Sequence, residues 1–304
     1  MTGMPTDRRQ LVEQYLRGET DVVEPRDAAT VVLLRDGAAG PEVYLLRRRP
    51  TMAFAAGMHV FPGGAVDPRD RDGGERWVGP PPAAWAEAFT CDPGLAGALV
   101  CAAVRETFEE SGVLLAAHED GTPVTDTTGE DWERDRLALI DGELALSEFL
   151  SRRSLVVRAD LLRPWAHWIT PEWQPRRFDT RFFLAALPAG QSTRDVGGEA
   201  DAVIWLPAAD AFEGFRSGSL TLMNATASIL RDLSAHADVA SAMAAPRQIR
   251  PVLGHPVLTD GRLEYVYDGE RGTAPLSELV EPLGEPGSAM TDGEESAGRG
   301  ARFN

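Results

Sequence analysis

Apolar and polar positions in the first quarter of the chain follow the pattern of a β-hairpin. Residues 28–34 (AATVVLL) and 42–47 (EVYLLR) are rich in apolar and β-branched side chains, and the glycine- and proline-containing segment 35–41 separates them. This arrangement predicts two antiparallel strands joined by a turn. The segment 57–64 (GMHVFPGG) then predicts a short strand that runs into a Pro-Gly-Gly turn.

The segment 98–115 (ALVCAAVRETFEESGVLL) carries the clearest helical pattern, and Gly112 stands where a helix C-cap is expected. At about 100° per residue, the apolar positions 100, 104 and 108 share one face, which we expect to pack on a sheet. The opposite face carries three carboxylates within about one turn, those of Glu106, Glu109 and Glu110.

The rest of the chain predicts an alternation of helices and strands. We expect helices at 9–17, 134–150, 154–162 and 223–237, and strands at 166–170, 180–187 and 202–206. These elements favour an N-terminal extension (1–26), a catalytic domain (27–237) and a C-terminal extension (238–283). The domain would contain an insertion at about 71–97 and a helical insertion at about 119–162. Residues 284–304 have the composition of a disordered tail.

Composition excludes several classes of function. All 30 basic residues are arginine, so lysine Schiff-base chemistry and a Walker-type phosphate lysine are excluded. The net charge of −17 argues against a nucleic-acid partner. No apolar run reaches the length of a membrane span, no signal-peptide pattern opens the chain, and two cysteines do not form a disulfide framework. We therefore expect a cytoplasmic protein with no membrane partner; the sequence indicates no oligomeric state.

The carboxylate face of the 98–115 helix has two interpretations. Three like charges on one turn repel each other by a few tenths of a kcal/mol per pair, which a solvated acidic face tolerates. The same cluster provides the hard oxygen ligands that Mg²⁺ prefers, and the ion would then bridge to substrate phosphates. Taken alone, the pattern is more often a solvated face.

The neighbourhood of the helix changes that balance. Gly64, an acidic residue six positions later (Asp70), and the run Arg105-Glu106-Thr107-Phe108-Glu109-Glu110-Ser111-Gly112-Val113 together resemble the Nudix box, G-x5-E-x7-R-E-U-x-E-E-x-G-U, where U is aliphatic. Asp70 replaces a glutamate, Thr107 occupies an aliphatic position, and the insertion at 71–97 splits the spacer. A split box of this kind resembles the branch that includes the peroxisomal coenzyme A diphosphatases. The resemblance extends over about 28–237.

This resemblance implies a Nudix-type α/β/α sandwich with a mixed sheet and a hydrolase that cleaves a nucleoside diphosphate derivative. It implies Mg²⁺, with Mn²⁺ as an alternative, held by Glu106 and Glu110 with Glu109 next. Glu106 and Glu109 would also act in catalysis, and Arg105 would orient the cluster. Gly63 and Gly64 would shape the substrate loop.

The segment from Leu45 to Gly64 resembles a second motif, that of coenzyme A-cleaving Nudix enzymes, L-L-T-x-R-S-x2-R-x3-G-x3-F-P-G-G. Arg49 matches its first arginine, whereas Ala53 stands in place of the second. Coenzyme A or acyl-coenzyme A is therefore the favoured substrate. A nucleotide sugar, a dinucleotide such as NADH, a damaged nucleotide or ADP-ribose remain alternatives, as does a catalytically silent ligand sensor with this fold.

Other residues are weaker candidates for the site. Arg176, Arg177 and Arg181 could clamp phosphates, and alternation places Arg177 and Arg181 on one strand face, although a surface role is about as frequent for such residues. Glu199, before the strand at 202–206, and Asp70 are candidates for an extra carboxylate. The insertion at 71–97 carries three large aromatic residues and looks like a long excursion from the surface. We expect it to act as a lid or a wall of the site.

Overall fold

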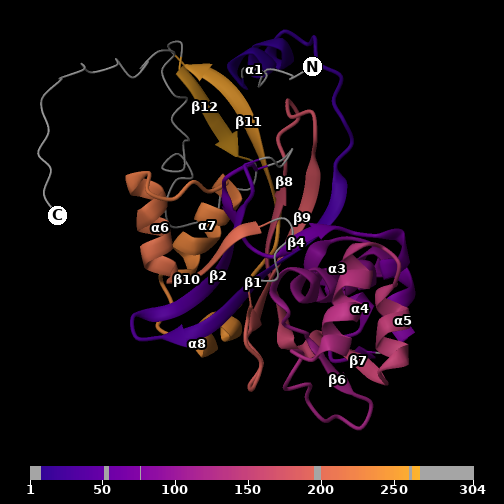
Figure 1. Cartoon of the computed structure of the whole chain (residues 1–304). Helices are drawn as coiled ribbons and strands as arrows, with labels where there is room; N and C mark the ends of the chain where they lie inside the picture. The colour runs from indigo at the N-terminus through magenta and orange to yellow at the C-terminus, as the bar shows by residue number, and fades with distance from the viewer. Residues whose placement is uncertain (1–7, 51–54, 76, 195–199, 260–261, 268–304) are drawn as a thin grey trace, which may run out of the picture.

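The computed structural model describes residues 8–50, 55–75, 77–194, 200–259 and 262–267 (Figure 1). Its centre is a mixed sheet with the strand order β10-β2-β1-β9-β8-β11-β12, in which β3 pairs with β2 and β4 with β1. The pairs β1–β9 and β8–β11 are parallel, and the other pairs are antiparallel. The strand bounds are β1 Arg26–Gly37, β2 Gly40–Arg48, β3 His59–Val60, β4 Gly63–Ala65, β8 Leu162–Ile169, β9 Phe178–Ala186, β10 Ala200–Pro207, β11 Pro251–Thr259 and β12 Arg262–Tyr267.

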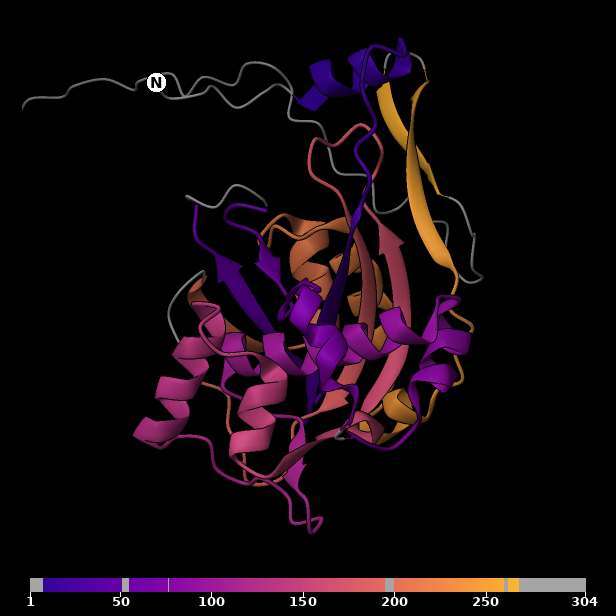
Figure 2. The same cartoon turned by 90° about the vertical axis from the view of Figure 1, so that its right-hand side faces the viewer.

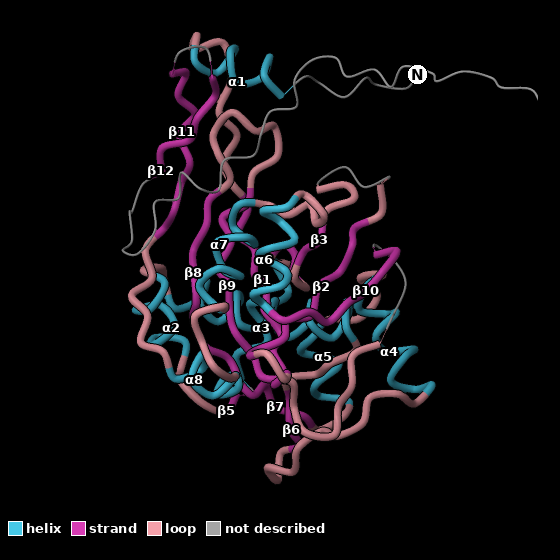
Figure 3. The backbone as a smooth tube through the Cα atoms, turned by 90° about the vertical axis from the view of Figure 1, so that its left-hand side faces the viewer, coloured by secondary structure: helices cyan, strands magenta, loops and turns pink. Residues whose placement is uncertain are grey.

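Two helical layers cover the sheet, one on each face (Figures 1 and 3). Alternate residues of β1 divide between two hydrophobic cores: Val31 and Leu33 belong to the core with α3, and Val32 and Leu34 to the core with α7. This period of two is what a strand buried on both faces requires. The first layer contains α2 Pro82–Phe89, α3 Pro93–Ser111, α4 Glu130–Ile140 and α5 Leu146–Arg152, and the second contains α6 Ala208–Ser217, α7 Asn224–Leu233 and α8 Val239–Ala244. The predicted α/β/α sandwich is confirmed.

A second, three-stranded sheet lies below the first helical layer (Figure 1). It consists of β5 Trp77–Val78, β7 Leu155–Arg158 and β6 Ala116–His118, in the order β5-β7-β6. The helix predicted at 154–162 was therefore wrong. Leu155 and Val157 are buried while the residues between and after them are half-buried, which is the period of a strand. Only the 3₁₀ turn Ala159–Leu161 follows it.

The insertion at 71–97 is part of the core. After a 3₁₀ segment at Pro68–Glu75, helix α2 places Trp85 and Phe89 against Phe183 of the central sheet, at ring-centroid distances of 5.5 and 5.1 Å. Both side chains are at most 3% exposed. The expectation of a surface excursion was wrong because these aromatic residues fill the layer between α3 and the sheet.

The two extensions reach the far end of the sheet (Figure 2). In α1 (Arg8–Leu16), Val12 packs against Trp173, and the Tyr15 hydroxyl donates a hydrogen bond of 2.6 Å to Glu172. The described part of the C-terminal extension forms β11 and β12. The predicted tail at 284–304 lies outside the described residues. Within the described chain, no single helix could cross a membrane; α2 and α3, bent by 96°, satisfy the length and composition test only as a pair.

Candidate active site

Helix α3 orients the carboxylates predicted from the sequence. It begins with Pro93 after the N-cap Asp92, whose side chain accepts from the Leu95 N–H, and it ends at Gly112, which has the left-handed φ of 73°. The helix thus starts five residues earlier than expected. Its predicted apolar face is completely buried, at residues 100, 104 and 108. Burial of this face turns the opposite, glutamate-bearing face toward β4.

Strand β4 touches two of the glutamates directly. The Gly63 N–H donates a hydrogen bond of 2.8 Å to Glu110 Oε2. A Cβ atom on Gly64 would lie 2.4 Å from Glu106 Oε1, and one on Gly63 would lie 2.6 Å from the Ala29 carbonyl oxygen. Close packing against backbone therefore requires glycine at position 63, whereas a side chain at position 64 would displace the Glu106 carboxylate.

Arg105 holds the cluster together. Its Nη1 donates to Glu106 at 2.8 Å and to Glu109 at 3.3 Å, while Nε and Nη2 form a forked ion pair with Asp70 at 3.0 and 2.9 Å. Nη2 also donates to the Ala65 carbonyl. Asp70 is only 2% exposed and faces the guanidinium. Asp70 thus positions Arg105, and Arg105 positions the glutamates.

The cluster carries more negative charge than Arg105 neutralises. Burial raises the pKa of Glu106 to about 7, even though Arg105 acts in the opposite direction. Burial also raises the pKa of Glu109. Both shifts mean that the ionised carboxylates lack compensating positive charge at this position.

A divalent cation fits this donor set in its chemistry. Carboxylate oxygens in a half-buried group are the hard ligands that Mg²⁺ and Mn²⁺ accept. As placed, however, no group of three or more His, Cys, Asp or Glu side chains in the described residues is arranged to hold a metal ion. The oxygens are directed to Arg105 and to the Gly63 N–H instead. Glu106, Glu109 and Glu110 are the residues that would hold the ion.

A cavity of about 760 Å³ opens beside the cluster. Residues of β1, β9 and β8 form its floor. Its walls come from β4, α3, the start of α7 and the hairpin β11–β12. The charged residues that line it are four arginines and three glutamates: Arg26, Arg48, Arg105, Arg176, Glu106, Glu109 and Glu110. An apolar wall accompanies them: Leu46, Met58, Val60, Phe61, Trp168, Ile169, Pro171, Phe178 and Phe182.

Gly63, Gly64 and Arg176 line this cavity as expected, but the other three predicted substrate arginines do not. Arg177 is 6% exposed and donates to the backbone carbonyls of Val23 and Thr170. Arg181 is 4% exposed and pairs with Asp27. Arg49 is exposed and donates to the Ala200 carbonyl at 3.4 Å. Glu199 lies outside the described residues. Within the described chain, the cavity lining also includes no residue of the insertion at 71–97, so the predicted lid is not found there.

Arg176 lines the cavity as predicted, whereas Arg26 and Arg48 are cavity arginines that sequence reasoning missed. Arg176 precedes Phe178, and Thr180 and Phe182 follow on the same, cavity-lining side of β9. Alternation along the strand correctly grouped Arg177 with Arg181 but did not show which face meets the site. Arg48 likewise shares its side of β2 with Leu46. Residues two positions apart on a strand share a face, so the apolar cavity residues at even positions could have indicated that Arg176 and Arg48 face the cavity.

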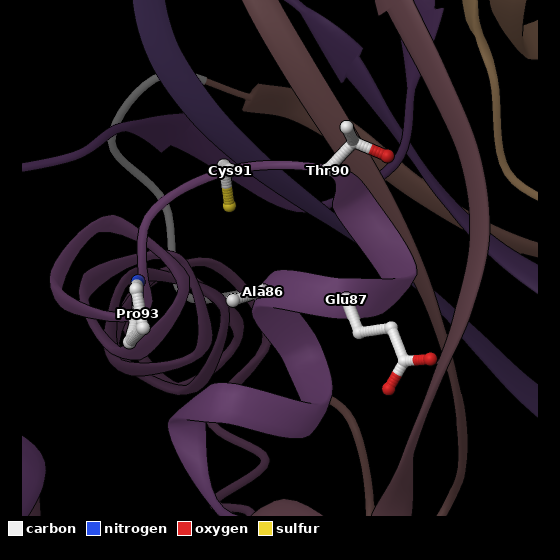
Figure 4. A pocket seen from close by; sticks show the side chains of 5 residues that line it. All are labelled: Ala86, Glu87, Thr90, Cys91 and Pro93. Atoms are coloured by element: carbon white, nitrogen blue, oxygen red, sulfur yellow. The ribbon is translucent and has the colours of Figure 1, made fainter.

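A second hollow, of about 490 Å³, lies at the junction of α2 and α3 and contains no cluster of charged groups (Figure 4). Glu87 points away from Cys91 in this view, and burial raises the pKa of the Cys91 thiol. The other cysteine, Cys101, is fully buried, which raises its thiol pKa to about 12. Neither thiol is in a setting that favours a reactive thiolate.

Comparison with known proteins agrees with this arrangement. The model of the NUDT19 Nudix domain matches residues 90–226. The acyl-coenzyme A diphosphatases NUDT19 of Xenopus laevis and Homo sapiens are 28% and 30% identical over 210 and 223 residues, which is 58% and 61% of this chain. The chain spans only 55% and 58% of the length of those two proteins. The crystal structure of a Nudix hydrolase from Alicyclobacillus acidocaldarius is 36% identical, with a TM-score of 0.66, and the alignment covers 74% of this chain and 98% of that one.

The α/β/α sandwich, the glutamate helix packed against a glycine strand, and these similarities define the class of protein. The chain belongs to the Nudix hydrolase family.

Proposed function

We propose that this protein is a Mg²⁺-dependent pyrophosphohydrolase that cleaves the diphosphate of coenzyme A or acyl-coenzyme A. The observation that carries the proposal is the cluster of Glu106, Glu109 and Glu110, held by Arg105 and β4 at the edge of a cavity large enough for an extended substrate. A diphosphate seated there would meet carboxylates for the cation and arginines for its own oxygens.

The reaction adds water across a P–O–P bond. The water oxygen bonds to one phosphorus, the bridging oxygen leaves with the other phosphate, and a carboxylate of the cluster, Glu106 or Glu109, accepts the proton of the water. Bound Mg²⁺ would neutralise phosphate charge and lower the pKa of a bound water. Arg105 keeps the carboxylates in place, and the cavity arginines orient the substrate.

Coenzyme A is favoured over smaller diphosphates for two reasons. The apolar wall around Phe178 and Trp168 suits a pantetheine or acyl chain, which a nucleoside triphosphate lacks. The NUDT19 relatives are named acyl-coenzyme A diphosphatases. ADP-ribose, NADH and nucleotide sugars share the diphosphate and are the main competing substrates.

Product analysis tests the proposal. The full chain with MgCl₂ should convert coenzyme A to 3′,5′-ADP and 4′-phosphopantetheine, and excess EDTA should stop the reaction. ADP-ribose, NADH and a nucleotide sugar at the same concentration serve as competitors. A higher kcat/KM for any of them would contradict the coenzyme A assignment, and hydrolysis of none would contradict the proposed activity. Tight binding without turnover would instead indicate a ligand sensor.

A further inference from the structure

We propose that the first turn of α7 forms a second anion subsite in the cavity, which binds a phosphate monoester of the substrate at a distance from the bond that is cleaved. This inference rests on the proposed function for the identity of the ligand. The residues that form the subsite are Asn224, Ala225 and Thr226, and all three line the cavity.

The start of α7 presents free backbone donors. The N-cap residue Met223 is extended, with φ −75° and ψ 152°, and no side chain caps the helix. The backbone N–H groups of residues 224–226 fall in the first turn, where the helix provides no acceptor for them. The helix is ten residues long and has no acidic residue in its first turn, so its positive end is not neutralised locally. Such an end attracts phosphate oxygens.

Thr226 gives an independent indication of a ligand. Its side chain is 4% exposed and borders the cavity, and within the described chain no hydrogen bond of its hydroxyl is found. Its hydroxyl oxygen is not itself fully buried, so a hydrogen-bond partner can reach it from the cavity. A phosphate oxygen in the cavity would provide one, because the hydroxyl can donate to it beside the backbone N–H groups.

The surroundings hold this turn in place. The Asn224 amide donates a hydrogen bond of 2.7 Å to the Tyr267 hydroxyl, and the Tyr267 ring meets Trp168 edge-on at 5.7 Å. Through Tyr267, strand β12 of the C-terminal extension thereby contacts the start of α7 and helps to hold it in position. The carboxylates that line the cavity come from α3, in the opposite helical layer (Figure 1). The α7 turn and the glutamates therefore approach the cavity from different sides, as two phosphate-bearing parts of one substrate require.

Two substitutions test the subsite. Asn224→Asp places a negative charge in the first turn, which favours the helix itself but repels an anion. Thr226→Val removes the hydroxyl at nearly constant volume. The matched controls are Ala209→Asp, which adds the same charge to the exposed first turn of α6, and Ser228→Ala, which removes a buried hydroxyl of α7 outside the cavity lining.

The measurement is calorimetric titration of the full chain with adenosine 3′,5′-bisphosphate in EDTA, with adenosine 5′-monophosphate as the probe that lacks the second phosphate. Asn224→Asp should weaken bisphosphate binding at least about 10-fold and Thr226→Val about 5-fold, a loss of roughly 1 kcal/mol or more. Monophosphate binding and the controls should change less than about 2-fold, which is under roughly 0.5 kcal/mol.

Bisphosphate affinities equal to that of the unsubstituted chain in both variants would overturn the subsite, as would equal losses for the two nucleotides. A drop in melting temperature for Asn224→Asp without a change in affinity would indicate a structural role only and would also overturn it. These results are independent of turnover. If the unsubstituted chain hydrolyses no diphosphate but the variants lose bisphosphate selectivity, the subsite stands and the proposed activity fails.

Discussion

The acidic end of the cavity and its arginine-bearing wall are assembled from the chain in different ways. Three glutamates and Arg105 come from less than two turns of α3, and β4 and Asp70 contact this cluster from other parts of the chain. The cavity arginines other than Arg105 come from the start of β1, the end of β2 and the loop before β9. The acidic end is therefore local in sequence, whereas the wall depends on how the strands align.

The largest effect should follow from loss of a cluster carboxylate. Glu110→Gln and Glu106→Gln should each lower kcat at least about 100-fold, or roughly 2.7 kcal/mol, because each removes a charge that would hold the cation. The exposed Glu119 provides the control, since Glu119→Gln removes an equal charge away from the cavity. Steady-state kinetics with coenzyme A and MgCl₂ would check this. A Glu110→Gln enzyme within about threefold of the parent would contradict the assignment of the acidic end.

Asp70→Asn should mainly affect stability. It breaks a buried forked pair with Arg105, so we expect a loss of about 3 kcal/mol in the free energy of unfolding, measured by urea denaturation. Asp201→Asn breaks the more exposed pair with Arg47 and should lower the free energy of unfolding much less. Similar losses in the two variants would show that the Arg105 network is no more important than a surface ion pair.

The glutamate helix could be predicted from the sequence, whereas the wall could not. Helical periodicity alone placed Glu106, Glu109 and Glu110 on one face, because all three lie on one element. Arg177 and Arg181 were grouped correctly by strand alternation, but the choice between the two sheet faces depends on which helical layer leaves the cavity open. Trp85 and Phe89 were expected at the surface for a similar reason. Their burial depends on Phe183, which lies about 100 positions away in the sequence.

The neighbouring residues Arg176 and Arg177 lie on opposite sides of the chain, and only Arg176 lines the cavity. Arg176→Ala should raise KM for coenzyme A about 5-fold, roughly 1 kcal/mol, with kcat little changed, because Arg176 lines the cavity. Arg177→Ala should leave KM unchanged and lower the melting temperature, because its guanidinium binds two backbone carbonyls. Kinetics and thermal denaturation of both variants would check this. A reversal of the two effects would show that β9 presents its other face to the substrate.

The smallest effect concerns acid stability beside the acidic end. Hydrogen bonds from Arg69 lower the pKa of Asp67 to about 2, from an ordinary value of 3.8. A carboxyl whose pKa is lower in the folded than in the unfolded chain stabilises the fold at pH values above the unfolded-state pKa. This contribution disappears as pH falls from about 4 to 2. Between about pH 4 and 2, the free energy of unfolding of Asp67→Asn should therefore fall by about 1 kcal/mol less than that of the parent chain, given the solvent screening of this pair. An unchanged acid profile would show that Asp67 does not support the segment before α3.

Direct measurement of metal binding tests the central claim, that the α3 carboxylates form a cation site. Mn²⁺ would be titrated into the full chain, and free Mn²⁺ would be followed by its electron paramagnetic resonance signal, with Glu110→Gln and Glu119→Gln in parallel. We predict that Glu110→Gln weakens Mn²⁺ binding at least about 10-fold, roughly 1.4 kcal/mol, while Glu119→Gln retains the parent affinity. Equal Mn²⁺ affinities in all three proteins, or no binding to the parent chain, would contradict the account.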